Sequence, residues 1–158
     1  MSKGIIGIDP GKGGGACILR PETYSVGPGT VDLKPWRIDH EFIDMMQSLS
    51  PEDYEVVIED VPAFVSAATS NASSFKLGQN FGLILGTSRS LRFATHLVKP
   101  QIWQKGLIGL RPKMGYTLRK RILKDNAIRL FPDLKITNAT ADAVLIMNWY
   151  RSEAIRND

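Results

Sequence analysis

Three acidic residues stand where apolar segments of the sequence give way to polar ones. Asp9 follows the run 4–8, Glu59 follows the run 55–58, and Asp142 lies in the otherwise apolar first turn of a predicted helix. Clustered carboxylates repel one another unless a cation is bound, so a convergence of the three would form a divalent-metal site. With oxygen ligands alone we expect Mg²⁺ or Mn²⁺ rather than zinc. Two such ions about 3.5–4 Å apart would activate a water molecule and stabilise the leaving oxygen in phosphodiester hydrolysis.

Two of these acids also have an ordinary structural explanation. Asp9-Pro10-Gly11 is a common turn sequence, so this stretch alone does not separate a turn residue from a metal ligand. Asp142 would be favoured near a helix N-terminus by the helix dipole. Ala141 and Ala143 on either side of it nevertheless suggest that this turn lies against other backbone, as it would beside a sheet.

Basic residues are concentrated between positions 99 and 129, in a chain of net charge +4 and pI about 9.3. The segment contains Lys99, Lys105, Arg111, Lys113, Arg119, Lys120, Arg121, Lys124 and Arg129, against the single acid Asp125. A cationic patch of this kind suits a polyanion such as nucleic acid, whereas an isolated run of charge is usually a solvated helix face. The three acids favour the first interpretation, because a metal site of this type acts on phosphodiesters.

Size and composition are those of an ordinary globular protein. The 158 residues are 43% hydrophobic and 23% charged, enough for one well-cored domain, which we expect to span residues 1–158. No apolar run approaches the ~18 residues needed to cross a membrane, and the single cysteine, Cys17, excludes an internal disulfide. We therefore expect a protein of the reducing cytosol with no membrane partner.

Strands come early in the sequence and then alternate with helices. Apolar and β-branched runs predict strands at 4–8, 16–19, 30–33, 55–58 and 95–98, and helical spacing predicts helices at 35–49, 73–92, 101–105, 116–130 and 140–155. This order predicts an α/β protein with a mixed central β-sheet flanked by helices. Two acids at strand ends and one at a helix start could then converge on one point.

The long predicted helix at 73–92 carries glycine at positions 78, 82 and 86, which leaves one face without side chains. Each glycine costs a helix roughly 1 kcal/mol relative to alanine. Three in register therefore indicate that another backbone approaches this face. We expect this backbone to belong to the same chain rather than to a partner subunit.

Several of these motifs, in this order, resemble the RuvC-type Holliday junction resolvases of the RNase H-like fold, especially their phage-encoded relatives. The matching segments are Ile8-Asp9-Pro10-Gly11, Val57-Ile58-Glu59, Asn71-Ala72-Ser73-Ser74 with Lys76-Leu77-Gly78-Gln79 and Gly82, Val98-Lys99, and Ala141-Asp142-Ala143. The start of the long helix is the most diagnostic of them, because metal chemistry does not require it. The likeness extends from about residue 4 to 150.

The resemblance implies a homodimer that binds a four-way DNA junction and nicks two opposed strands in a Mg²⁺-dependent reaction. It implies that Asp9, Glu59 and Asp142 hold the metal ions and that Lys99 acts beside the scissile phosphate. Phe64 would present an aromatic ring to unpaired bases, unless it only packs within its loop. The residues expected to contact DNA are Phe64, Lys76, Lys99, Lys105, Lys113, Arg119, Lys120, Arg121 and Lys124. The implied location is a bacterial or phage-infected host cytosol.

One position departs from the pattern of that family. The resolvases generally carry a second acid or a histidine three to five residues before the last aspartate, where this chain has Thr137, Asn138 and Ala139. We take Asn138 as the candidate fourth metal ligand, through a neutral carbonyl oxygen. Either three carboxylates suffice, or metal affinity is reduced, or Asn138 replaces an aspartate and inactivates the enzyme.

Three other functions are compatible with parts of this sequence. Another nuclease of the same fold would cut flaps, branched packaging DNA or RNA–DNA hybrids with the same three acids. A junction-binding protein that has lost cleavage would keep the basic helix and lack the fourth acid. An ATPase of the actin or sugar-kinase type also begins with a strand ending in Asp-x-Gly, but it needs two such domains and far more chain than 158 residues.

Overall fold

The computed structural model of the chain describes residues 2–21, 31–35, 40–62 and 69–157. The strands are β1 (Gly4–Ile8), β2 (Gly15–Leu19), β3 (Val31–Pro35), β4 (Tyr54–Glu59) and β5 (Ala94–Val98). The helices are α1 (His40–Gln47), α2 (Asn71–Ser90), α3 (Pro100–Trp103), α4 (Tyr116–Leu130) and α5 (Ala141–Asn157). In these ranges no helix has the length and apolar character that a membrane crossing requires.

The sequence places most elements to within two residues, but the helix predicted at 35–49 is α1 (His40–Gln47), and Pro35 ends β3 instead. The predicted helix at 116–130 coincides with α4, whereas the predicted helix at 73–92 begins at Asn71 instead. Its start is set by Ser70, whose side chain accepts a hydrogen bond from the Ser73 amide at 3.2 Å. Such a cap satisfies one of the free amides of the first helical turn and so fixes where the helix begins.

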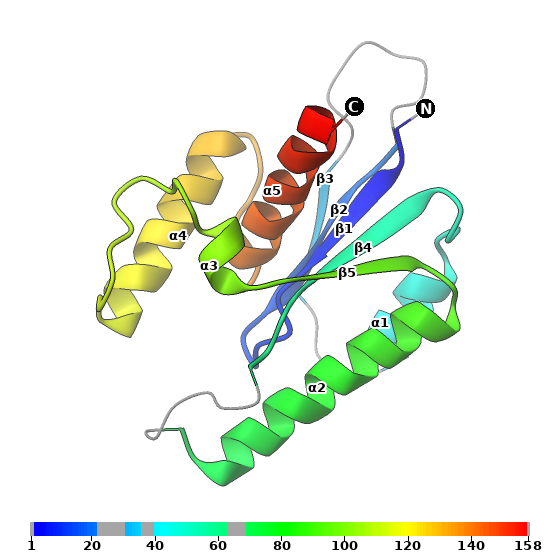
Figure 1. The fold of residues 1–158 in the computed structure, drawn as a ribbon, viewed down its shortest axis with the longest axis horizontal. Coiled ribbons are helices and arrows are strands. Elements are labelled where there is room, and N and C mark those ends of the chain that lie inside the picture. Colours follow the sequence, from blue (N-terminus) through cyan, green and yellow to red (C-terminus); the bar gives the residue numbers. More distant parts are fainter. Residues whose placement is uncertain (1, 22–30, 36–39, 63–68, 158) are drawn as a thin grey trace.

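The five strands form one sheet in the order β3-β2-β1-β4-β5 (Figure 1). β1 pairs antiparallel with β2 and parallel with β4, and β5 extends the parallel side. The predicted α/β architecture, a mixed sheet flanked by helices, is confirmed. Because β1 and β4 run in the same direction and Ile8 pairs with Ile58, the residues that follow them, Asp9 and Glu59, meet at one edge of the sheet.

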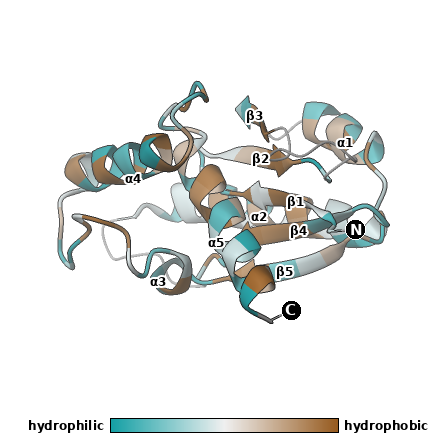
Figure 2. Cartoon of the chain, turned by 90° about the horizontal axis from the view of Figure 1, so that it is seen from above, coloured by the Kyte–Doolittle hydropathy of each residue, from teal (hydrophilic) through white to brown (hydrophobic). Residues whose placement is uncertain are grey.

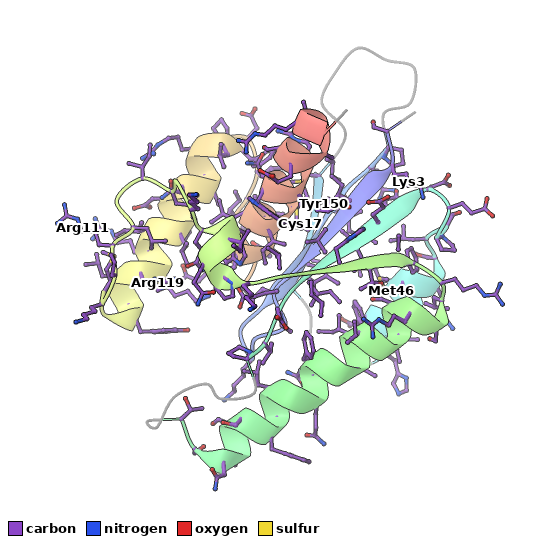
Figure 3. The ribbon with its side chains drawn as sticks, in the orientation of Figure 1. Lys3, Cys17, Met46, Arg111, Arg119 and Tyr150 are labelled. Carbon is purple, nitrogen blue, oxygen red and sulfur yellow. The ribbon has the colours of Figure 1, made fainter. Side chains whose placement is uncertain are left out.

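Each face of the sheet carries its own apolar core. Ile5 of β1 packs on the face covered by α3, α4 and α5, and Ile6 packs on the face covered by α1 and α2. Successive strand residues point to opposite faces, so the continuous apolar run of β1 supplies both cores (Figure 2). Figure 3 shows the same division, with Cys17 and Tyr150 on the side of α5 and Met46, a buried residue of α1, on the other side.

Two glycines allow α5 and the turn before it to lie directly against the sheet. A methyl group at Gly7 of β1 would lie 2.5 Å from the carbonyl oxygen of Ala143, and one at Gly15 of β2 would lie 2.7 Å from that of Ala139. A real Cβ does not approach backbone so closely, so only glycine permits this packing. The prediction drawn from the alanines beside Asp142 is therefore confirmed, since the first turn of α5 lies against sheet backbone.

The expected packing of the α2 glycines against another part of this same chain is wrong for the described residues. A side chain added at Gly78, Gly82 or Gly86 would meet nothing within 4 Å, so the described residues leave this face uncovered. The residues of α2 that are buried are Ile84 and Ser88. Each helical residue turns by about 100°, so Gly82 and Gly86 lie about 200° around the axis from Ile84. The glycine face therefore points away from the core.

Candidate active site

A cavity of about 810 Å³ opens at the edge of the sheet where β1 and β4 end. Asp9, Glu59 and Asp142 all line it, as does Asn138. The structure thus brings the three predicted acids and the predicted fourth ligand to one place. The wall that faces them is the basic helix α4, which contributes Lys120, Arg121 and Lys124.

Asp9 serves both the turn and the cavity. Its Oδ1 accepts a hydrogen bond from the Gly11 amide at 3.0 Å, and its own amide donates to the Gly15 carbonyl at 3.0 Å. A methyl group at Gly14 would lie 2.1 Å from the Asp9 carbonyl oxygen, so the turn requires glycine there. The turn interpretation is correct for Oδ1, while Oδ2 lies 4.0 Å from the Nζ of Lys120.

Glu59 is held by Trp103, a residue for which the sequence patterns indicate no role. The indole Nε1 donates to Glu59 Oε2 at 2.9 Å, and the Trp103 ring is only 2% exposed, so this donor is firmly placed. The contact arises because β5 pairs beside β4, with Val98 opposite Glu59, and α3 follows immediately. An aromatic residue just after the strand that neighbours a strand-end acid is the signal that could have identified it.

The two carboxylate oxygens of Asp142 differ in their hydrogen bonding. The side chain is 7% exposed and lies in the first turn of α5. Its Oδ2 accepts a hydrogen bond from Lys120 Nζ at 2.5 Å. Its Oδ1 is the one buried side-chain nitrogen or oxygen of the described residues that has no hydrogen-bond partner. Because buried polar atoms are normally satisfied, this oxygen is available to a ligand.

Burial and mutual repulsion shift Asp9 and Glu59 toward their protonated forms. Burial, followed by the charge of Asp142, raises the pKa of Asp9, against the opposing charge of Lys120. Burial, followed by the charges of Asp9 and Asp142, raises the pKa of Glu59 to about 7, although the hydrogen bond from Trp103 lowers it. These carboxylates are therefore close enough to repel one another, and either a proton or a cation relieves that repulsion.

Among the described cations that line the cavity, Lys120 is the one that pairs with Asp9 and Asp142. Burial lowers the pKa of its ammonium, but the charge and hydrogen bond of Asp142, and then the charge of Asp9, outweigh this effect and raise it. Within the described ranges, no three aspartate, glutamate, histidine or cysteine side chains are arranged so that they could hold a metal ion. The donor chemistry nevertheless fits Mg²⁺, because the site offers carboxylate oxygens, one of them buried and unpartnered.

Among the described residues, the other predicted DNA contacts lie outside this cavity. Lys99 directly follows β5 at the same edge of the sheet but does not line the cavity. Arg119 donates through its guanidinium to the side chain of Gln104. Lys76 near the start of α2 is exposed, as are Lys105 and Lys113 between α3 and α4. Phe64 lies outside the described residues.

Sequence reasoning misses several residues that line the cavity, among them Lys12, Tyr116 and Thr117. Lys12 lies in the turn after β1, and Tyr116 and Thr117 begin α4. The signal that could have found them is their position, since each flanks a segment already predicted to belong to the site. Tyr116 is 75% exposed, so its ring is accessible to a ligand that enters the cavity.

Solved structures of one bacterial protein share this architecture. Thermus thermophilus RuvC matches with a TM-score of 0.58 at 16% identity, covering 98% of this chain and 96% of that one. T. thermophilus RuvC in complex with Holliday junction substrate matches with a TM-score of 0.59 at 14% identity, over the same shares. No family model and no curated protein matches the sequence. The chain therefore has the RuvC-like, RNase H-like fold that its motifs predict.

Proposed function

We propose that this chain is a structure-selective, metal-dependent DNA endonuclease that resolves four-way junctions by paired nicking. The observation that carries the proposal is the meeting of Asp9, Glu59 and Asp142 in one cavity whose facing wall is the basic helix α4. The fold supports it, because T. thermophilus RuvC has the same fold and has been solved in complex with Holliday junction substrate. The phage-encoded branch and the cytosolic location stay expectations from the resemblance.

The three acids would hold the divalent ions, with Mg²⁺ as the cofactor and Mn²⁺ as its substitute. The unpartnered Oδ1 of Asp142 would be one ligand atom, and the amide oxygen of Asn138 would take the fourth position. Bound ions would polarise the scissile phosphate and lower the pKa of the attacking water. Trp103 would keep the Glu59 carboxylate oriented, because its indole donor is fixed by burial.

The basic wall of the cavity would receive the DNA backbone. Arg121 and Lys124 lie on α4, and Lys12 lies in the turn beside Asp9. Contacts to phosphate position a duplex without reading its sequence, which suits an enzyme that recognises the shape of a junction. The catalytic role of Lys99 and the contacts of the other predicted DNA-binding residues, which are Phe64, Lys76, Lys105, Lys113, Arg119 and Lys120, stay predictions.

Paired nicking requires two active sites, so the proposal includes a homodimer. We assign its interface to the amino-terminal half of α2, where no residue from Asn71 to Asn80 is buried and Phe75 is 67% exposed. A helix that projects an aromatic side chain beside bare glycines offers both an apolar contact and close approach to another helix. Sedimentation velocity tests this assignment, and we expect Phe75→Asp to convert a dimer into a monomer.

Cleavage of a labelled four-way junction tests the function directly. The substrates are the junction with duplex, flap and RNA–DNA hybrid controls, each in Mg²⁺, in Mn²⁺ and in EDTA. The proteins are the wild type, Asp9→Asn and Asn138→Asp. We expect paired nicks on the junction that disappear in EDTA and with Asp9→Asn, because both remove the cation from the acidic cavity.

The other outcomes assign other functions. Tight junction binding without cleavage, with cleavage restored by Asn138→Asp, would identify a disarmed junction-binding protein. Preferential cutting of the flap or the hybrid would identify a different nuclease of the same fold. If Asn138→Asp leaves the metal-dependent rate unchanged, Asn138 is not a metal ligand.

A further inference from the structure

Lys120 stands between two carboxylates that a divalent ion would also need. Its Nζ lies 2.5 Å from Oδ2 of Asp142 and 4.0 Å from Oδ2 of Asp9. The two acids are 7% and 6% exposed, so little water reaches either of them. An ammonium placed between two buried carboxylates offsets their repulsion and therefore plays the electrostatic part of a bound cation.

We infer that Lys120 is a tethered counter-ion that competes with the divalent metal ion for Asp9 and Asp142. This inference rests on the proposed function, because it assigns a regulation of the same site. Without divalent ions, the ammonium holds the two acids together. When a divalent ion binds them, the ammonium leaves Asp142 and its charge turns into the cavity, where a DNA phosphate would bind.

The position of Lys120 on α4 allows this movement. α4 is attached to the core by Leu123 and Ala127, which are buried, whereas the Lys120 side chain is 24% exposed and lines the open cavity. A lysine side chain carries its compact charge on a flexible chain of four carbons, so the ammonium can move away from Asp142 without shifting the helix. The ion pair is therefore separable from the packing of α4 against α5.

The neighbouring cations of α4 do not share this arrangement. Arg121 lies 3.9 Å from Asp125 on its own helix, and Lys124 has no ion pair with the three acids in the part of the chain that the structure describes. Both nevertheless line the same cavity. Lys124, one helical turn beyond Lys120, is therefore a matched control for the loss of one positive charge near the site.

Direct metal binding tests the inference without DNA or cleavage. Mn²⁺ and Mg²⁺ are titrated calorimetrically into the wild type, Lys120→Met and Lys124→Met. Methionine keeps an unbranched side chain of similar length and removes the charge. We expect Lys120→Met to bind Mn²⁺ about tenfold tighter or more, because the ion no longer displaces an ammonium. Lys124→Met should match the wild type to within about twofold, because among the described residues Lys124 forms no ion pair with Asp9 or Asp142 that a metal ion would have to displace.

Thermal melting gives an independent readout. In EDTA we expect Lys120→Met to melt below the wild type, because Asp9 and Asp142 then repel each other without a counter-ion. Saturating Mn²⁺ should remove that difference. If Lys120→Met does not fold in EDTA, refolding on addition of Mn²⁺ supports the inference and failure to refold overturns it. Lys120→Gln, which is also neutral, should reproduce the result.

The opposite results separate the inference from the proposed function. Equal or weaker Mn²⁺ binding by Lys120→Met and Lys120→Gln, with saturable binding by the wild type, overturns the competition and leaves the nuclease proposal intact. Absence of saturable Mn²⁺ binding from all of these proteins overturns both. Saturable Mn²⁺ binding by Lys120→Met and Lys120→Gln but not by the wild type supports the inference, because it means that the ammonium of Lys120 blocks the site completely.

Discussion

Each of the three acids uses one oxygen for a donor that the protein itself supplies. Asp9 accepts from a turn amide, Glu59 accepts from the indole of Trp103, and Asp142 accepts from Lys120. Donors of this kind orient the carboxylates through the folded chain.

The hydrogen bond from the indole of Trp103 is expected to lower the pKa of Glu59. Trp103→Phe keeps most of the buried ring but removes the hydrogen bond that lowers the pKa of Glu59, so that pKa should rise. We expect the midpoint of the pH–rate profile for junction cleavage to move upward by about one unit. Trp149→Phe is the control, since Trp149 contacts the Tyr150 ring instead. A lowered melting temperature with an unmoved midpoint would show that Trp103 is only structural.

Glu59 should also make stability depend on pH when no divalent ion is present. Folding raises its pKa from 4.5 to about 7, so the folded state binds the proton more tightly than the unfolded state. Stability is therefore lost as pH rises from about 4.5 to 7, by roughly 3 kcal/mol, and the loss persists at higher pH.

Glu59→Gln removes this pH dependence. In EDTA we expect the melting temperature of Glu59→Gln, relative to the wild type, to increase as the pH is raised from about 5 to about 8. If the melting temperatures of the two proteins change equally with pH over this range, the raised pKa of Glu59 is contradicted. Added Mg²⁺ should abolish the advantage of glutamine, because the wild-type carboxylate then has a cation to neutralise it.

Among the elements, the contact between β1 and α5 decides whether the site exists. Gly7→Ala would place a methyl group 2.5 Å from the Ala143 carbonyl oxygen and 2.8 Å from Met147, so α5 must move away from the sheet. We expect a loss of about 2–4 kcal/mol of unfolding free energy, measured by urea denaturation, together with weaker Mn²⁺ binding. A variant as stable as the wild type would show that α5 does not rest on Gly7.

Gly86→Ala in α2 is the matched control. No atom lies within 4 Å of a Cβ at Gly86, so alanine meets no steric conflict there. We expect a gain of about 1 kcal/mol from helix propensity alone. The sequence correctly shows that this face of α2 lacks side chains, but a stripe of glycines does not encode the direction in which the face points.

Across the whole molecule, charge is divided between the acidic sheet edge and the basic helix that faces it. The residues that line the cavity at this edge come from both the amino-terminal and the carboxy-terminal parts of the chain. For this reason we propose that residues 1–158 form a single nuclease domain. A DNA backbone entering the cavity would meet positive charge on one wall before it reached the acids.

The salt dependence of junction binding tests that arrangement. Arg121, whose side chain is 78% exposed, is expected to contact a phosphate. Arg121→Ala should weaken binding to junctions of any sequence and lower the slope of log affinity against log salt by about one. Fluorescence anisotropy in EDTA measures this, with Arg89→Ala at the end of α2 as the control. An unaltered slope would exclude a phosphate contact by Arg121.

The sequence by itself determined the elements, the mixed sheet and the three acids. These follow from local information, because apolar periodicity, turn residues and strand-end carboxylates are all read within short segments. Only the tertiary structure decided how those acids are held. The Lys120–Asp142 contact joins residues 22 positions apart, and the Trp103–Glu59 contact joins residues 44 positions apart. Such pairs depend on which faces α3 and α4 turn toward the sheet edge, and packing of the whole chain sets those faces.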